Sequence, residues 1–225
     1  MRPRLNTARD LLPTLLNRNP GIRSVQLAAL AKVSPATMVR MLKEAGQEVI
    51  RSGQTSSTRY FLRRSLRGMD AGIPVYAVDI FGQASQVGML DLTAPSGCLM
   101  DVQAMGWPVD NEFGKGVWPD GLPYPLQDMR PQGFLGRQFA LQESGPLGVP
   151  TSPKDWSDDD VLHALLQRGV DTPGNLILGD AALQRWLQTK TALPLVLDDQ
   201  TIEAGYSDYA AQSSSRGAGG SSAAG

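Results

Sequence analysis

The sequence predicts an α+β protein made of a basic, helical N-terminal module followed by an acidic, β-rich module. Residues 1–69 hold 13 Lys and Arg against three Asp and Glu, whereas residues 70–225 hold eight against 19, so a net charge of −1 conceals +10 beside −11. The apolar residues follow a helical period before Asp70 and an alternating period after it. We therefore expect one domain over 1–69, a second over 74–210 and a Gly/Ser-rich segment over 211–225.

Composition narrows the classes of protein to which the chain can belong. With 225 residues and 41% hydrophobic content it can bury two small cores. No apolar run approaches the roughly 20 residues of a membrane span, and the N-terminus lacks a secretory signal, so we expect a cytoplasmic protein without a membrane partner. The single Cys98 and single His163 leave too few soft ligands for a zinc site, so no metal site is expected and both residues are expected to be structural.

The first two helices of the basic module follow from its apolar spacing. Helically spaced leucines indicate a helix from Thr7 to Asn17, which the run Asn19-Pro20-Gly21 ends. A second helix is expected over Val25–Ala31, with Ser24 as its N-cap and Leu30 among its inward side chains.

The third helix has the clearest signals. Ser34 is the expected N-cap, Pro35 takes the first helical position, where its missing N–H costs nothing, and Gly46 ends the helix in a left-handed conformation. Its apolar stripe consists of Met38, Met41, Leu42 and Ala45. This stripe leaves the opposite face to small, polar and basic side chains.

Two helices joined by so short a turn match a helix-turn-helix, in which the second helix enters the major groove of DNA. The residues expected to contact DNA from this helix are Ser34, Thr37, Arg40 and Lys43. Arg40 could bind either guanine or a phosphate.

A two-stranded hairpin is predicted after the third helix, over Glu48–Ser52 and Thr58–Arg63, around a Gly/Ser/Thr tip. Such a hairpin is the wing of a winged helix. Arg51 and Arg59 flank the tip and could enter a minor groove or lie along phosphates, and Arg63 extends the charge.

DNA is therefore the expected partner of the basic module, and Arg64 and Arg67 continue its charge. Two alternatives stay open. A winged helix can mediate protein contacts without DNA, and a basic surface can have no specific partner at all.

The acidic module is predicted to follow a linker at 67–72. Its expected strands run from Val75 to Phe81, from Val87 to Leu92, from Cys98 to Val102 and from Asn175 to Leu178. The Gly/Pro-rich passage 106–137 also holds Phe113, Trp118, Tyr124 and Phe134. We expect it to form an ordered irregular loop packed on the sheet.

The run Ser157-Asp158-Asp159-Asp160 has two interpretations. A cluster of carboxylates could bind the metal of a nuclease. Alternatively, Ser157 is the N-cap of a helix over Val161–Arg168, and the carboxylates complement the dipole of its first turn. We favour the helix start. A second helix is expected over Asp180–Gln188.

The tail from Ser213 to Gly225 has no side chain that could build a core, which is typical of a flexible linker. Because glycines allow close approach to phosphates and serines can accept them, a phosphate-binding or phosphorylated loop is the alternative.

The chain resembles a known family, and two segments show the resemblance most specifically. The run from Asp120 to Arg137 resembles the HipA-type toxin kinases, in the branch called YjjJ or HipH. The run from Leu165 to Asn175 is similar to the leucine-rich helix of that family and the Gly-x-Asp-x-x-Gly turn after it. The resemblance covers essentially the whole chain. It implies an N-terminal winged helix-turn-helix, then a small β-rich HipA-like N-terminal kinase subdomain, then an all-helical catalytic domain.

The resemblance also bears on the tail. The family's glycine-rich loop contains a Ser-x-Ala-Gly-x-Gln motif whose serine is autophosphorylated, and Ser222-Ala223-Ala224-Gly225 matches its first four positions. The implied phosphorylation sites are Ser222 and its neighbours Ser221 and Ser215, and the implied nucleotide loop contains Gly219, Gly220 and Gly225.

The family's nucleotide-binding lysine and its catalytic and magnesium-binding aspartates would all lie beyond Gly225. No catalytic residue is therefore expected in this chain, and a chain of these 225 residues alone is expected to use no cofactor and to have no kinase activity. A longer protein would be an ATP- and Mg²⁺-dependent serine/threonine protein kinase. The resemblance implies a protein substrate for it, such as an aminoacyl-tRNA synthetase.

Two functions remain in competition. In the first, the chain is the N-terminal part of a toxin-antitoxin kinase, whose winged helix acts as a built-in antitoxin-like or autoregulatory element. In the second, it is a free-standing winged-helix transcription regulator with an acidic sensor or oligomerisation domain. The second explains the charge split equally well, but it does not explain the match at Ser222.

Overall fold

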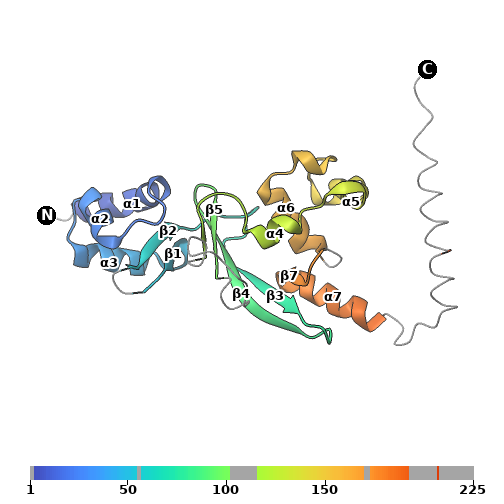
Figure 1. The fold of residues 1–225 in the computed structure, drawn as a ribbon. Helices are drawn as coiled ribbons and strands as arrows, with labels where there is room; N and C mark the ends of the chain where they lie inside the picture. Colours follow the sequence, from blue (N-terminus) through green and yellow to red (C-terminus); the bar gives the residue numbers. More distant parts are fainter. Residues whose placement is uncertain (1–2, 55–56, 102–115, 170–172, 193–206, 208–225) are drawn as a thin grey trace, which may run out of the picture. The chain divides into compact units, whose positions relative to one another are not determined.

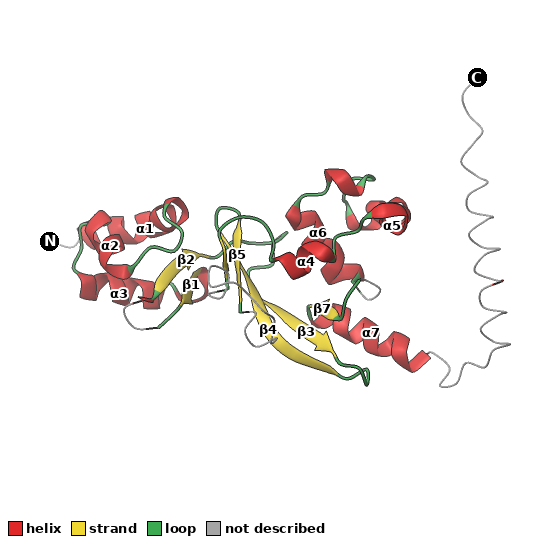
Figure 2. Ribbon diagram, viewed as in Figure 1, coloured by secondary structure: helices red, strands yellow, loops and turns green. Residues whose placement is uncertain are grey.

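The computed structural model describes residues 3–54, 57–101, 116–169, 173–192 and 207. The α-helices are α1 (Pro3–Arg18), α2 (Ser24–Leu30), α3 (Pro35–Glu44), α4 (Tyr124–Asp128), α5 (Gly133–Leu147), α6 (Asp158–Arg168) and α7 (Asp180–Ala192). The strands are β1 (Val49–Ser52), β2 (Arg59–Leu62), β3 (Ile73–Val78), β4 (Ala84–Thr93), β5 (Gly97–Met100), β6 (Val117–Trp118) and β7 (Leu176–Leu178). The fold is α+β, as the sequence predicts, and the strands of both sheets pair antiparallel (Figure 2).

Helices α1, α2 and α3 gather around the β1–β2 hairpin (Figure 1). Their shared core consists of Leu12, Leu16, Leu27, Ala28, Met38 and Leu42. In α3 the prediction is confirmed in detail, because Ser34 Oγ accepts a hydrogen bond from the Thr37 N–H at 3.2 Å and Pro35 begins the helix. Gly46 follows the helix with φ +57, as expected.

Two details of α2 differ from the prediction. The N-cap is Arg23 rather than Ser24, because the Gln26 side chain reaches back to accept from the Arg23 N–H at 3.3 Å. Leu30 is expected to point inward but is 51% exposed. The helix is only seven residues long, and its core contacts are made by Leu27 and Ala28.

The hairpin pairs β1 with β2 in antiparallel register, with Arg51 opposite Tyr60. Beyond β2 the chain does not leave as a free linker. The Arg64 N–H donates to the Leu92 carbonyl and the Ala94 N–H donates to the Leu62 carbonyl, both at 2.9 Å. The end of β2 therefore continues along β4.

The residue just before the segment expected to be a linker is packed into the core of the acidic module. Leu66 is 2% exposed and belongs to the main core cluster. The chain turns tightly after it, with reciprocal backbone hydrogen bonds between Leu66 and Met69 and with Gly68 at φ +87. Leu66 thus anchors this part of the chain, while residues 67–71 of the predicted linker are exposed.

The larger sheet has the strand order β6-β5-β4-β3-β7. Strand β3 is expected to reach Phe81 but ends at Val78, because the Asp79 carboxylate accepts from the N–H groups of Phe81 and Gln83 and closes a turn. The turn leaves Ile80 93% exposed. The strands expected at 87–92, 98–102 and 175–178 lie within or overlap β4, β5 and β7, although residue 102 lies outside the described residues.

The passage 106–137 is not the irregular loop that the sequence predicts throughout. Residues 102–115, which include Phe113, lie outside the described residues, but the rest holds β6, α4 and the start of the 15-residue α5. The buried face of α5 consists of Gly136, Ala140, Ser144 and Leu147. Three of these four side chains are small, so no large apolar stripe marks the helix in the sequence.

Helices α6 and α7 confirm the two helices predicted in this part. Ser157 caps α6, since its hydroxyl accepts from the Asp160 N–H at 3.2 Å while the Asp160 carboxylate accepts from the Ser157 N–H at 3.0 Å. Residues Met1–Arg185 form one compact unit and Trp186–Gly225 a second. Among the described residues, no helix has the length and apolarity that crossing a membrane requires.

Candidate nucleic-acid interface

Helix α3 and its N-cap carry four of the residues expected to contact DNA. Ser34 and Thr37 act as the N-terminal cap, with their hydroxyl oxygens 2.8 Å apart. Arg40 and Lys43 are exposed, one turn further along. Arg40 lies 3.8 Å from Glu44, a surface pair of low energy that a phosphate could displace. Lys43 makes no ion pair within the part of the chain that the structure describes.

The hairpin carries two more predicted contacts. Arg51 is exposed on β1. Arg59 on β2 donates from its guanidinium to the Gly21 carbonyl at 2.9 Å, which fixes it against the turn between α1 and α2. Gly53 begins the tip with φ +81, and the Ser57 hydroxyl donates to the Gln54 carbonyl at 2.7 Å. Residues 55–56 of the tip lie outside the described residues.

Arg63 lies in different surroundings from the other predicted DNA contacts. Its guanidinium donates to the Asp91 carboxylate at 2.6 Å and to the Gln47 carbonyl at 2.7 Å. Its side chain is only 16% exposed. The guanidinium of Arg63 is therefore held by an ion pair with the acidic module.

The two arginines that follow are held in the same way. Arg64 donates to Asp159 at 2.6 Å and Arg67 donates to Asp160 at 2.6 Å. Arg67 also donates to the Leu147 carbonyl at 2.9 Å. We call these three ion pairs, Arg63–Asp91, Arg64–Asp159 and Arg67–Asp160, the arginine seam. The sequence suggested that these three arginines extend the DNA-binding surface, but in the structure they form ion pairs between the basic module and the acidic one.

The carboxylates at 158–160 are engaged by arginines and by the helix cap, not by one another. Asp158 pairs with Arg130, while Asp159 and Asp160 belong to the seam. Burial acts to raise the pKa of Asp160, but the hydrogen bonds from Ser157 and the charge of Arg67 outweigh it and hold that pKa below its ordinary value. No cluster of three metal-binding side chains occurs among the described residues. Of the two interpretations of this run, the helix start is the one that the structure confirms, through the cap at Ser157.

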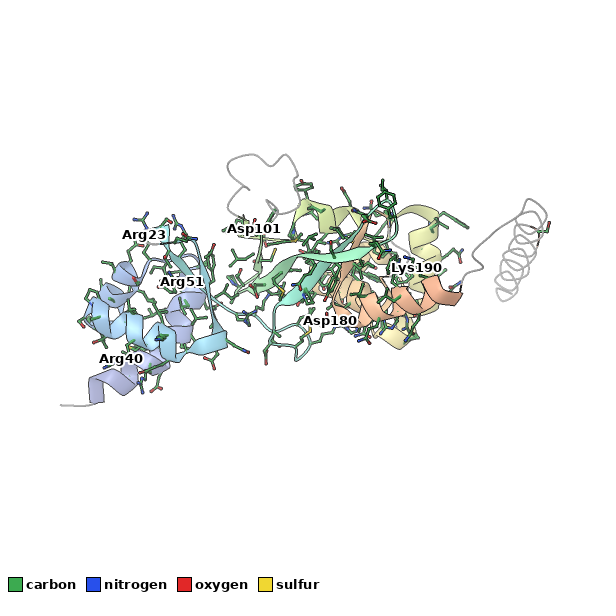
Figure 3. All side chains as sticks on the ribbon, turned by 90° about the horizontal axis from the view of Figure 1, so that it is seen from below. Arg23, Arg40, Arg51, Asp101, Asp180 and Lys190 are labelled. Carbon is green, nitrogen blue, oxygen red and sulfur yellow. The ribbon has the colours of Figure 1, made fainter. Side chains whose placement is uncertain are left out.

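Sequence reasoning missed Arg23. It is exposed at the N-cap of α2 and lines a cleft of about 490 Å³ together with Arg59 and the hairpin residues Ser52, Gly53 and Ser57. In the view of Figure 3, Arg23 and Arg40 lie on opposite sides of the basic module, with Arg51 between them. The exposed cations therefore form two surfaces, one on α3 and one beside the hairpin. The signal available from the sequence was the position of Arg23 immediately before the second helix.

Cys98 and His163 have the surroundings of structural residues. Burial raises the pKa of the Cys98 thiol to about 12, which keeps it protonated and unreactive. Burial, with the nearby charge of Arg67, lowers the pKa of His163. The predicted phosphorylation and nucleotide-loop residues, Ser215, Gly219, Gly220, Ser221, Ser222 and Gly225, lie outside the described residues.

Comparisons with known proteins place the chain in a family. The model of the family described as "YjjJ-like toxin, middle domain" matches residues 69–187. The chain is also 33% identical over 168 residues to Toxin YjjJ of Escherichia coli (strain K12), an alignment that covers 75% of this chain and 36% of that protein. No solved structure matches the chain significantly.

The chain therefore belongs to the YjjJ-like toxin family. The branch named from the segment 120–137 is confirmed at this level. The chain spans little more than a third of the length of the curated relative that it matches. Kinase activity and DNA binding remain matters for proposal.

Proposed function

We propose that this chain is the DNA-binding and N-terminal part of a toxin-antitoxin system toxin, in which a winged helix binds DNA through α3 and the β1–β2 hairpin. The observation that carries the proposal is the solvent-exposed pair Arg40 and Lys43 on a helix whose other face is fully buried. The basic module of 13 Lys and Arg against three acids supplies the attraction to a polyanion. A DNA-binding toxin could occupy the promoter of its own gene and so regulate it.

The arrangement supports a division of labour between the two cationic surfaces. On α3, the side chains of the first turns could reach base edges in a major groove. Beside the hairpin, Arg23, Arg51 and Arg59 could lie along the phosphate backbone. Arg63 takes no part in this proposal, because Asp91 already engages it.

Fluorescence anisotropy with a duplex of about 30 base pairs from the promoter of its own gene, and with an unrelated duplex, tests the proposal. The double variant Arg40→Glu/Lys43→Glu is expected to weaken binding by about 10- to 100-fold and to reduce the slope of log affinity against log salt by about 1.8, or about 0.9 for each phosphate that the variant no longer neutralises. Arg63→Gln is expected to change affinity by less than about twofold, since its partner is a carboxylate.

The matched control for the single variant Arg40→Glu is Arg18→Glu, which makes the same change of net charge at an exposed position at the end of α1, outside α3 and the hairpin. If this control weakens binding as much as the α3 variant, then only bulk charge matters and α3 is not the interface. Equal affinity of all variants for DNA would also rule the interface out.

We further propose that the full-length protein is an ATP- and Mg²⁺-dependent serine/threonine protein kinase, with a protein substrate such as an aminoacyl-tRNA synthetase. Membership of a toxin family supports the toxin part, and the match of Ser222-Ala223-Ala224-Gly225 to an autophosphorylated loop supports the kinase part. When bound, ATP and Mg²⁺ would supply the phosphoryl group and neutralise its charge. The contribution of this chain would be the serine that accepts the phosphate and the glycines around it.

Intact mass measurement of the full-length protein, before and after phosphatase treatment, tests this second part. One phosphate is expected, peptide mapping should place it on Ser222, and Ser222→Ala should abolish it while Ser213→Ala, the matched control in the same tail, should not. An unmodified tail under ATP-binding conditions would favour the rival function, a winged-helix transcription regulator with an acidic sensor domain.

A further inference from the structure

Half of the cations of the acidic module line one groove. Residues 70–225 hold only eight Lys and Arg against 19 acids. Four of the eight line two adjoining pockets: Arg130, Arg137, Lys154 and Arg168. The only acid among the described residues that line either pocket is Asp128. This groove is therefore locally basic in a module that is acidic overall.

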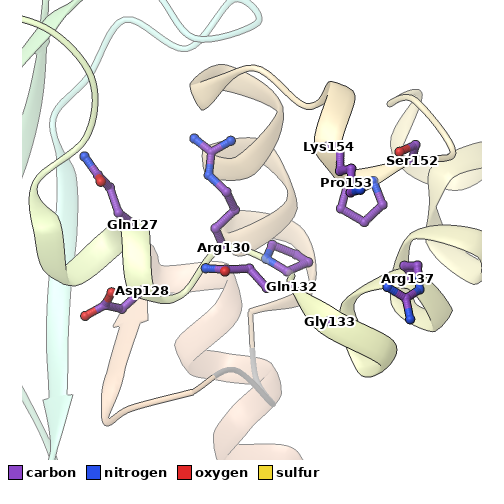
Figure 4. A pocket seen from close by; sticks show the side chains of 10 residues that line it. Gln127, Asp128, Arg130, Gln132, Gly133, Arg137, Ser152, Pro153 and Lys154 are labelled. Atoms are coloured by element: carbon purple, nitrogen blue, oxygen red, sulfur yellow. The ribbon is translucent and has the colours of Figure 1, made fainter.

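The first pocket is a cleft of about 550 Å³ between the start of α5 and the 3-10 helix η4 (Pro153–Asp155). Figure 4 shows Arg137 coming from α5 on one side and Lys154 from η4 on the other. Both side chains are exposed, and neither has a hydrogen-bond or ion-pair partner among the described residues. These two cations are available to an incoming anion.

The second pocket adjoins the first and is apolar. It has a volume of about 300 Å³, and the two share Asp128, Arg130, Pro131 and Gln132. Its apolar lining consists of Met129, Leu135, Phe139, Leu165 and Pro173. The other two cations are fixed at its border, since Arg130 pairs with Asp158 and Arg168 donates to Glu143 at 2.9 Å. Together the pockets form a groove with an apolar slot at one end and free positive charge at the other.

The apolar surface continues outside the slot. Phe134 is 65% exposed, Leu135 72% and Leu141 62%, all on α5. Phe134 and Leu141 are seven residues apart and so lie on the same face of the helix. Exposed apolar side chains that adjoin a groove are typical of a surface that binds another protein. A small anion would leave them in water.

We propose that this groove, between α5, η4 and α6, docks an acidic, apolar segment of a separate protein partner. Large apolar side chains of the partner fill the slot beside Leu135 and Phe139, and its carboxylates pair with Arg137 and Lys154. The charge complementarity selects an acidic segment, because the unpaired cations Arg137 and Lys154 line the groove. The apolar slot selects a polypeptide over a nucleic acid, whose phosphates would gain nothing from it.

A library of random dodecapeptides displayed on phage and selected against the 225-residue chain tests this proposal. The enriched peptides should combine Asp or Glu with Leu, Ile or Phe. One of them, labelled with fluorescein, should bind in an anisotropy titration. Arg137→Glu/Lys154→Glu should weaken that binding by about tenfold or more, as expected for the loss of two partly desolvated ion pairs.

Two further variants sharpen the result. Leu135→Asp should weaken peptide binding without changing the melting temperature, because this side chain is largely exposed. Arg18→Glu/Lys32→Glu, with the same change in net charge, should bind the peptide as the unaltered chain does.

Three outcomes would overturn the proposal. The first is enrichment of peptides that are not acidic, or that bind the Arg137→Glu/Lys154→Glu variant equally well. The second is tighter binding of a single-stranded oligonucleotide or of inorganic phosphate at these same residues. The third is a concentration-dependent dimer that Arg137→Glu/Lys154→Glu dissociates, because the occupant would then be a second copy of the chain.

Discussion

Helices α3 and α5 bury opposite kinds of side chain. Helix α3 directs Met38, Met41 and Leu42 into the core and presents charged and polar residues to solvent. Apart from Leu147, helix α5 buries small residues, and three of its large apolar residues remain exposed. The contrast shows that what a helix leaves exposed depends on how closely its neighbours approach it.

The different exposed faces suit different partners. A face with Arg40 and Lys43 attracts a polyanion, and the affinity comes from the release of counterions. A face with Phe134 and Leu141 is stabilised when its apolar surface is removed from water, which favours a partner with apolar side chains of its own. These differences are the basis for proposing DNA as the partner of α3 and a polypeptide as the partner of the groove beside α5.

The largest expected effect is on the α3 side of this comparison. Met38 is fully buried, so Met38→Ala should leave a cavity and lower the free energy of unfolding by about 2–5 kcal/mol. Urea denaturation followed by circular dichroism measures it. A decrease below about 1 kcal/mol would mean that the buried stripe of α3 does not anchor the helix.

The next effect concerns the small residues of α5. A Cβ at Gly136 would lie 2.5 Å from the carbonyl carbon of Pro131, a backbone atom that cannot move aside cheaply. Gly136→Ala should therefore destabilise the protein by about 1–3 kcal/mol. At Gly145 in the same helix no atom outside its chain neighbours lies within 4 Å of the added Cβ, but Pro146 follows it and disfavours the helical conformation of a residue that carries a Cβ. The helix propensity of Ala and this local clash oppose each other, so Gly145→Ala should change the stability by less than about 1 kcal/mol. Thermal denaturation of the pair tests close packing, and a Gly136→Ala variant as stable as Gly145→Ala would contradict it.

A smaller effect is expected at the arginine seam, which joins the parts of the chain that carry the two helices. The pKa of Asp160 is lower in the folded than in the unfolded chain, so its contribution to stability is complete above the unfolded value of about 4. The contribution is lost as the pH falls through the lowered pKa. Asp160→Asn should flatten the decline of stability between about pH 5 and pH 2, whereas Asp155→Asn, at an exposed position, should not. If the stability of the unaltered protein and of both variants declined in parallel with pH, the arginine seam would not contribute to the stability of the fold.

The smallest effects are expected on the outward faces of the two helices. Val39 on α3 is 49% exposed and Leu141 on α5 is 62% exposed. Replacing either by Ala should change the free energy of unfolding by no more than about 0.5 kcal/mol. A large destabilisation by Leu141→Ala would show that this side chain has an intramolecular partner, and it would weaken the case for an external one.

The sequence predicted α3 and failed at α5 for one physical reason. Large apolar residues at helical spacing mark a face that must leave water, so Met38, Met41 and Leu42 located the core side of α3. A face of Gly136, Ala140 and Ser144 carries no such signal, and the Gly/Pro-rich passage 106–137, which includes the start of α5, suggested a loop instead. What decides α5 is the approach of Pro131 to Gly136, which is a tertiary contact.

The number of basic residues in each module could be read from the sequence, but which of them face solvent and which form ion pairs could not. The sequence assigned Arg40, Arg51 and Arg63 to one surface, yet Asp91 engages Arg63 while the other two are exposed. Which opposite charges form pairs across a long separation in the sequence can be stated only once the fold is known. The helix start at Ser157 was predictable because capping depends on residues three positions apart.

The anchoring of Leu66 affects how this protein can be dissected. A deletion of residues 1–69 would remove a core side chain from the acidic module and would strip Asp91, Asp159 and Asp160 of their partners. The shortened protein would then lose stability as well as its basic module, and a change in toxicity could have either origin. Genetic tests of the basic module should therefore rely on surface substitutions, which leave Leu66 and the arginine seam intact.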